Sequence, residues 1–171
     1  MRRLLDQVYG AAAWAAALFM IGTLAMILLS VSGRLLDFHV RGTDAYAGYC
    51  MAAAAFLALA HTLKRGEHIR VTLILDHAGP RTRHALELWS HAAGLLCAAL
   101  LAWFSVRLAW QSFNFNDISQ GTDATPLWIP QTGMALGSTI FAIAVADELV
   151  AVLRGEKLRH RAADSEPIRS E

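Results

Sequence analysis

The sequence predicts an all-α integral membrane protein with four transmembrane helices, and three observations support this class. The chain of 171 residues is 56% hydrophobic and only 17% charged, a balance that ordinary soluble domains do not have. It contains four stretches of 19 or more residues without Asp, Glu, Lys or Arg. About 18 such residues already suffice to cross the hydrocarbon core of a bilayer. The connections are short, so no soluble domain of ordinary size fits beside the four stretches.

The first span follows two arginines, Arg2 and Arg3. Its uncharged run of 26 residues is longer than the apolar segment of about 7–15 residues in a secretory signal peptide. We therefore expect a retained signal anchor. The four expected spans, in chain order, are residues 8–33, 45–63, 88–106 and 127–146.

Aromatic residues mark the ends of the later spans. Tyr46 and Tyr49 open the second span, and Trp89 and Trp128 open the third and fourth, at depths where amphipathic rings are favoured. Beyond the third span lie three more aromatic residues, which predict that its helix continues into the interface while a basic residue extends its charged end outward. These are Trp110, Phe113 and Phe115, and the basic residue is Arg107.

The distribution of Lys and Arg predicts the orientation of the spans. The N-terminal tail carries two, the second connection five and the C-terminal tail five, against two in the first connection and one in the third. Because cytoplasmic segments are enriched in Lys and Arg, both termini and the second connection are expected in the cytoplasm. An even number of spans also requires both termini on one side. The predicted topology is N-in/C-in.

The second connection is expected to hold a further, amphipathic helix. Apolar residues fall at helical spacing and form one stripe, which predicts a helix lying in the cytoplasmic interface against anionic lipid headgroups. A solvated linker is the alternative. We expect one membrane domain over residues 1–155 and a disordered cytoplasmic tail over residues 156–171. The stripe consists of Val71, Ile74, Leu75 and Ala78.

No motif of enzyme chemistry is present. The chain has no metal-binding motif, no glycine-rich phosphate loop and no nucleophile elbow, so we expect no catalytic residues, no cofactor and no metal. Cys50 and Cys97 fall in separate spans and are interpreted as small apolar residues rather than a disulfide.

Two histidines allow an alternative function. His61 lies near the inner end of the second span and His91 just inside the third. Two such imidazoles on neighbouring helices could ligate a b-type haem, as in the membrane anchor of a respiratory oxidoreductase. The other interpretation is that both make ordinary interfacial hydrogen bonds.

Two further patterns lie in the fourth span. Asp147 and Glu148 could couple protons or cations, or could simply pair with Lys64 or Arg65. Gly133 and Gly137 form a G-x-x-x-G spacing that allows close helix packing, within the chain or with another subunit. A small homo-oligomeric transporter built on these glycines is a third hypothesis.

Two motifs suggest a family. The second connection begins Lys64-Arg65-Gly66-Glu67-His68-Ile69-Arg70-Val71, and the fourth span begins Leu127-Trp128-Ile129-Pro130-Gln131, with Met134-Ala135-Leu136-Gly137 behind it. With four N-in spans and a length near 170, the chain resembles the small membrane subunit of tripartite ATP-independent periplasmic (TRAP) transporters.

The resemblance implies a scaffold subunit in the bacterial inner membrane. It would pack against a large transport subunit, help to dock a periplasmic solute receptor and contact membrane lipids, with no nucleic acid involved. Uptake of organic acids would be driven by a sodium gradient rather than by ATP. Gly66, His68, Ile69 and Val71 would shape the cytoplasmic interfacial arm. Asp117, Asp123, Trp128 and Pro130 would lie near the periplasmic docking face.

Overall fold

The computed structural model describes residues 2–38, 40–65, 80–121 and 123–154. Over these ranges the chain forms four long helices and no strand, apart from an isolated bridge between Ile118 and Pro126. All four helices are long and apolar enough to cross a membrane, which confirms the predicted all-α class. The helices are α1 (Arg2–Leu35), α2 (Thr43–Arg65), α4 (Pro80–Phe115) and α5 (Trp128–Leu153).

Two helix boundaries differ from the expected spans in an informative way, the start of α5 and the end of α4. Each expected span lies inside a helix, except that Leu127 caps α5 rather than belonging to it. The third helix, α4, runs nine residues beyond the expected end of its span and stops at Phe115. The helical continuation predicted from the aromatic residues is therefore confirmed. The expected interfacial helix between α2 and α4 and the tail after residue 155 lie outside the described residues.

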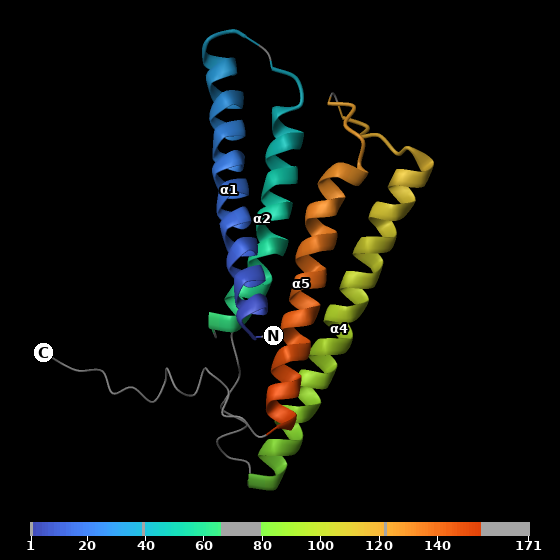
Figure 1. Ribbon diagram of the computed structural model, residues 1–171. Coiled ribbons are helices and arrows are strands. Elements are labelled where there is room, and N and C mark those ends of the chain that lie inside the picture. Colours follow the sequence, from blue (N-terminus) through green and yellow to red (C-terminus); the bar gives the residue numbers. More distant parts are fainter. Residues whose placement is uncertain (1, 39, 66–79, 122, 155–171) are drawn as a thin grey trace, which may run out of the picture.

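The four helices stand in a single layer, in the spatial order α1, α2, α5, α4 (Figure 1). α1 packs on α2, α2 on α5 and α5 on α4, whereas the contact between α1 and α5 is small. α2 and α5 are thus the central helices, and α1 and α4 form the two edges. The start of α1 and the end of α5 lie at one end of the layer, here called the terminal end. The α1–α2 and α4–α5 connections lie at the other, the loop end.

Small residues hold the two central helices together. A Cβ added to Gly133 would lie 2.9 Å from the Cβ of Ala53, and one added to Gly137 would collide with the backbone of Phe56. Only glycine permits so close an approach of two helix backbones, and this is how helices associate in lipid. Of the two interpretations of the G-x-x-x-G spacing, the structure shows packing within the chain.

The buried core is built mainly from alanine. On the α1–α2 side, Ala12 and Ala16 pack against Leu57. A second cluster joins all four helices through Tyr9, Ala60, Leu63, Ala98, Ala144 and Val145. The two cysteines are free and lie on α2 and α4, on either side of α5, so the prediction that they form no disulfide is confirmed.

Candidate functional site: polar layers at the two ends of the helices

At the loop end, a hydrogen-bonded knot joins the hairpin of α1 and α2 to the hairpin of α4 and α5. Tyr49, in the first turns of α2, donates its hydroxyl to Asp123 Oδ2 at 3.1 Å, and Ser119 donates to Asp123 Oδ1 at 2.8 Å. Thr125 donates to the hydroxyl of Tyr46 at 2.9 Å. Asp123 therefore connects the α4–α5 loop to a helix more than 70 residues earlier in the chain. We call these five residues the loop-end knot.

The loop itself folds back as a short hairpin. Its backbone bonds run from Ser119 N–H to Thr125 O at 2.8 Å and from Leu127 N–H to Asp117 O at 2.9 Å. Gly42 of the α1–α2 connection packs against it with φ +80°, and a Cβ there would lie 2.7 Å from the Cβ of Asp123. The two connections at this end are thus in direct contact.

The knot changes the acidity of Asp123. Desolvation by itself would raise the pKa of this carboxyl group, but hydrogen bonds from Ser119, Thr125, its own backbone N–H and Tyr49 outweigh it. The net pKa of Asp123 is therefore lowered from its ordinary value, because these donors stabilise the ionised form. Asp123 is a bonded anion that fixes the loop.

An open depression of about 600 Å³ lies beside the knot. It is formed by the end of α1, the α1–α2 connection and the tip of the α4–α5 loop at Gly121. On its wall Asp44 accepts a hydrogen bond from Ser30 at 3.0 Å and pairs with Arg34 at 3.6 Å. The depression is partly polar and open to the outside, which fits contact with a protein surface better than enclosure of a small ligand.

A second polar layer lies at the terminal end. Lys64 of α2 binds the carboxylate of Asp6 on α1, and its ammonium group lies 4.1 Å from the centre of the Tyr9 ring. Tyr9 is only 2% exposed, and its hydroxyl has no hydrogen-bond partner among the described residues. The carboxylates of Asp6, Asp147 and Glu148 are the acidic groups near that hydroxyl.

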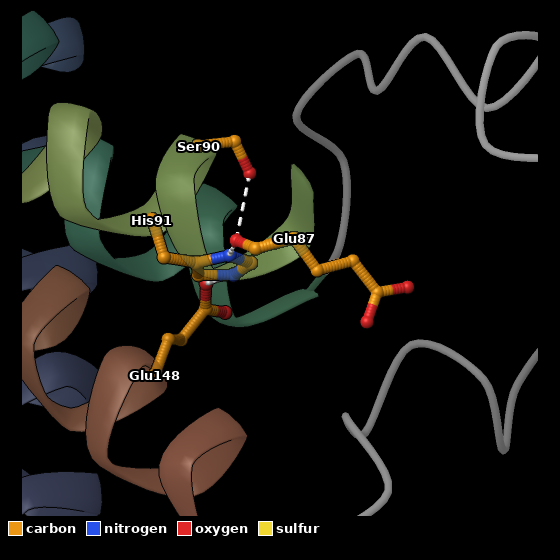
Figure 2. Close-up of polar contacts among 4 residues, drawn as sticks. All are labelled: Glu87, Ser90, His91 and Glu148. Atoms are coloured by element: carbon orange, nitrogen blue, oxygen red, sulfur yellow. Dashed lines mark hydrogen bonds and ion pairs between the residues drawn. The ribbon is translucent and has the colours of Figure 1, made fainter. Parts of the chain in front are cut away.

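On the other hairpin, His91 of α4 faces Glu148 of α5 (Figure 2). The imidazole Nδ1 lies 2.7 Å from the carbonyl oxygen of Glu87, so Nδ1 carries the proton that this bond requires. Nε2 lies 3.9 Å from Glu148 Oε2. With side chains only 10% and 14% exposed, the pair bridges α4 and α5 away from solvent.

The spacing of the two layers matches a bilayer. Asp44 in the loop-end layer and Lys64 in the terminal layer are twenty residues apart on α2. At 1.5 Å per residue this is about 30 Å, the thickness of the hydrocarbon core. The two polar layers are therefore spaced as the two surfaces of a bilayer would be.

The haem hypothesis gains no support from this geometry. α5 packs between the helices that carry His61 and His91. The two ring nitrogens of His91 already face the Glu87 carbonyl and the Glu148 carboxylate. The ordinary interfacial hydrogen bonding considered for His91 is what the structure shows.

The acidic pair of the fourth span lies in the last turns of α5, at the terminal end. Glu148 pairs with His91, a partner that the sequence did not suggest. Lys64 pairs with Asp6. The structure thus gives Glu148 a role in joining two helices.

The other candidate residues fall into three groups. Asp123 belongs to the loop-end knot, whereas the Asp117 side chain is exposed beside it. Trp128 stacks edge-to-face on Phe113 at 5.6 Å, and Pro130 lies in the first turn of α5. The four residues of the interfacial arm lie outside the described residues: Gly66, His68, Ile69 and Val71. Tyr46 and Tyr49 were predicted only as interfacial rings, because sequence cannot show which loop residues meet their hydroxyls, here Thr125 and Asp123.

Comparison with known proteins identifies the family of this chain. A family described as "Tripartite ATP-independent periplasmic transporters, DctQ component" matches residues 23–155, which include the C-terminal part of α1 from residue 23 on and all of the other three helices. No match to a curated protein was found. The chain belongs to the DctQ family, the small membrane component of TRAP transporters, which is a family of transporter components and not of enzymes.

Proposed function

We propose that this chain is the scaffold subunit of a sodium-driven TRAP system that takes up organic acids across the bacterial inner membrane. It packs against the large transport subunit, which binds solute and sodium, and it helps the periplasmic receptor to dock. The observation that carries this proposal is the single layer of helices in a DctQ family member.

A layer one helix thick cannot enclose a path for a solute. Every helix keeps two sides open to lipid or to a partner. Between the central helices no space remains, because Gly133 and Gly137 of α5 lie directly against α2. Those glycines are therefore not available to form the homo-oligomer that a small self-sufficient transporter would need. The single-layer shape therefore favours a subunit that supports a larger transport protein.

The orientation follows from charge. The excess of Lys and Arg in both tails and in the second connection favours a cytoplasmic terminal end. The loop end, with its depression and knot, then faces the periplasm. Fusion of a reporter that is active only in the cytoplasm to residue 154 and to residue 120 tests this, and activity at residue 120 would reverse the proposed topology.

The loop end divides into a fixed part and an accessible part. Asp123 holds the α4–α5 loop on α2, while Asp117 and Ile118 beside it remain exposed. Across the depression, Leu35 and Leu36 are exposed as well. We assign receptor contact to the accessible residues and positioning of the loop to Asp123.

The proposal is tested by uptake into vesicles that contain the large subunit, with receptor and a panel of labelled organic acids added outside. Uptake is expected only when this chain is present and only with an inward sodium gradient. Asp117→Lys should weaken receptor binding, whereas Gln120→Lys, elsewhere on the same loop, serves as the charge control. Sodium-dependent uptake by the large subunit and receptor without this chain would contradict the proposed role.

The self-sufficient transporter is addressed in the same assay. Vesicles that contain this chain alone should show no uptake. Uptake that is abolished by Glu148→Gln would instead establish a carboxylate-coupled transporter and overturn the scaffold function.

A further inference from the structure

One charged side chain lies between the two polar layers in the described helices, and it is Arg107 of α4. The corresponding stretches of α1, α2 and α5 have none. An arginine at the centre of a spanning helix is unfavourable, and such residues normally have a partner. Its depth and its surroundings therefore decide what it does.

Contacts between neighbouring helices fix the depth of Arg107. α4 and α5 are antiparallel and are aligned by the His91–Glu148 pair at one end and the Phe113–Trp128 ring contact at the other. Arg107 lies six residues before Phe113 and therefore opposite the first turns of α5, near Gly133.

Gly133 in turn lies against Ala53 of α2. Ala53 is nine residues from Asp44 and eleven from Lys64, or about 13 and 16 Å along the helix. Arg107 thus lies about midway between the two polar layers, deeper than the interfacial position expected from the sequence.

At this depth Arg107 cannot easily reach a membrane surface. Side chains leave an α-helix inclined toward its N-terminus, and the N-terminus of α4 is at the terminal end, the more distant surface. The outward extension predicted from the sequence would have to run against this inclination over about 13 Å, which is beyond what snorkelling provides. The side chain is exposed on α4 and makes no ion pair or hydrogen bond with a described residue.

The same face of α4 presents a surface that suits a protein partner. Trp103, Trp110 and Gln111 lie at i−4, i+3 and i+4 from Arg107, so they share its side of the helix. Both tryptophans are about two-thirds exposed, at 67% and 66%, and Gln111 is exposed as well. Tryptophan and arginine are enriched in protein interfaces, and an amide at membrane depth requires a hydrogen-bonding partner.

We propose that this Arg107 face (Trp103, Arg107, Trp110 and Gln111) binds a transmembrane helix of the large transport subunit, and that a carboxylate of that helix pairs with Arg107. The inference rests on the proposed function and names the surface through which it is carried out. A lipid phosphate is disfavoured as the partner, because phosphates lie at the polar layers and not at the depth of Ala53.

The first test compares Arg107→Leu with Leu18→Ala, a change on the exposed side of α1 at about the same depth. Each variant is co-expressed with the large subunit and purified in mild detergent. Arg107→Leu should lose roughly tenfold in affinity for the large subunit, while Leu18→Ala should not change it. The isolated Arg107→Leu subunit should meanwhile be at least as heat-stable as wild type, because a charge that has no partner among the described residues has been removed from the exposed face of α4.

The second test needs no loss of stability to be informative. A photoreactive phenylalanine analogue replaces Trp110 or, as the control, Trp14 of α1, and the intact membranes are irradiated. Crosslinks to the large subunit are expected from position 110 and not from position 14.

The outcomes separate the two proposals. If wild-type chain recovers no large subunit, the proposed function itself fails. If wild type recovers it and Arg107→Leu recovers it equally well, only the assignment of the Arg107 face fails. Loss of a bound acidic phospholipid from Arg107→Leu, with the large subunit retained and position 110 crosslinking only lipid, would show a lipid site and overturn the inference.

Discussion

The two edge helices, α1 and α4, occupy equivalent places in the layer but offer different surfaces. They have similar lengths, 34 and 36 residues, and each is mostly exposed in the isolated chain. Between the polar layers, every exposed residue of α1 is apolar, whereas α4 exposes Arg107 and Gln111. Exposure alone therefore does not tell which edge meets lipid; charge at a known depth distinguishes them.

The largest effect is expected when α1 is given the charge of α4. Leu18→Arg places an arginine near mid-membrane on the edge that we assign to lipid. Insertion should become less favourable by about 3–4 kcal/mol, measured as the membrane-integrated fraction of newly made chain. Leu18→Met serves as the control for side-chain size. Normal insertion and normal amounts of Leu18→Arg would mean that α1 also has a polar partner.

The two edge helices keep their places only if the central helices α2 and α5 stay packed together. Gly137→Leu should destabilise the α2–α5 contact by about 2–3 kcal/mol, because the new side chain meets the backbone of Phe56, which cannot rotate away. The matched control is Gly94→Leu on α4, where an added Cβ meets nothing within 4 Å. Thermal unfolding in detergent measures both, and equal stability of the two variants would contradict the observed packing.

Two exposed tryptophans, one on each edge helix, provide a further test of the difference between α1 and α4. Trp103→Ala on α4 should weaken association with the large subunit by about 1–2 kcal/mol, as expected for an aromatic residue in an interface. Trp14→Ala on α1, which removes a ring that is even more exposed, at 76% against 67% for Trp103, should leave association unchanged. Titration of the purified subunits in nanodiscs gives both affinities. A larger loss from Trp14→Ala would exchange the assigned roles of the two edges.

The smallest effect is expected at the loop-end knot, which both hairpins share. Because the pKa of Asp123 is lowered in the folded state, its stabilisation is present above its ordinary pKa and is lost as pH falls through the lowered value. Thermal unfolding from pH 6 to pH 3 should show this loss in wild type. Asp123→Asn should flatten it, and Asp117→Asn, with its exposed side chain, should not.

Most of the fold follows from the sequence, because charge-free stretches of about 20 residues have few alternatives to a transmembrane helix. The close packing of Gly133 and Gly137 was also predictable as a packing contact, although its partner was not. The lateral order of the helices could not be predicted, because nothing in the sequence pattern of α2 or α5 indicates that these two helices are central. Apolar faces toward lipid and toward another helix have the same composition.

The polar sites were predicted less completely, for a related reason. Asp123 and Glu148 were recognised as candidates, but their partners Tyr49 and His91 lie 74 and 57 residues away in sequence. For Arg107 the sequence predicted that the helix continues past it, as α4 does, but it could not give the position of this residue relative to the neighbouring helices. That position follows only from the contacts of α4 with α5.

The unequal lengths of the helices have a mechanical consequence. α1 and α4 measure about 51 and 54 Å at 1.5 Å per residue, against about 35 and 39 Å for α2 and α5. Figure 1 shows α4 inclined relative to α1, one of the ways in which a long helix fits a thinner bilayer. The layer thus has long rims around a shorter middle, and the rims reach beyond the two polar layers rather than ending at them. A neighbouring subunit that moves alongside would therefore be guided by the rims over a greater height than by the middle.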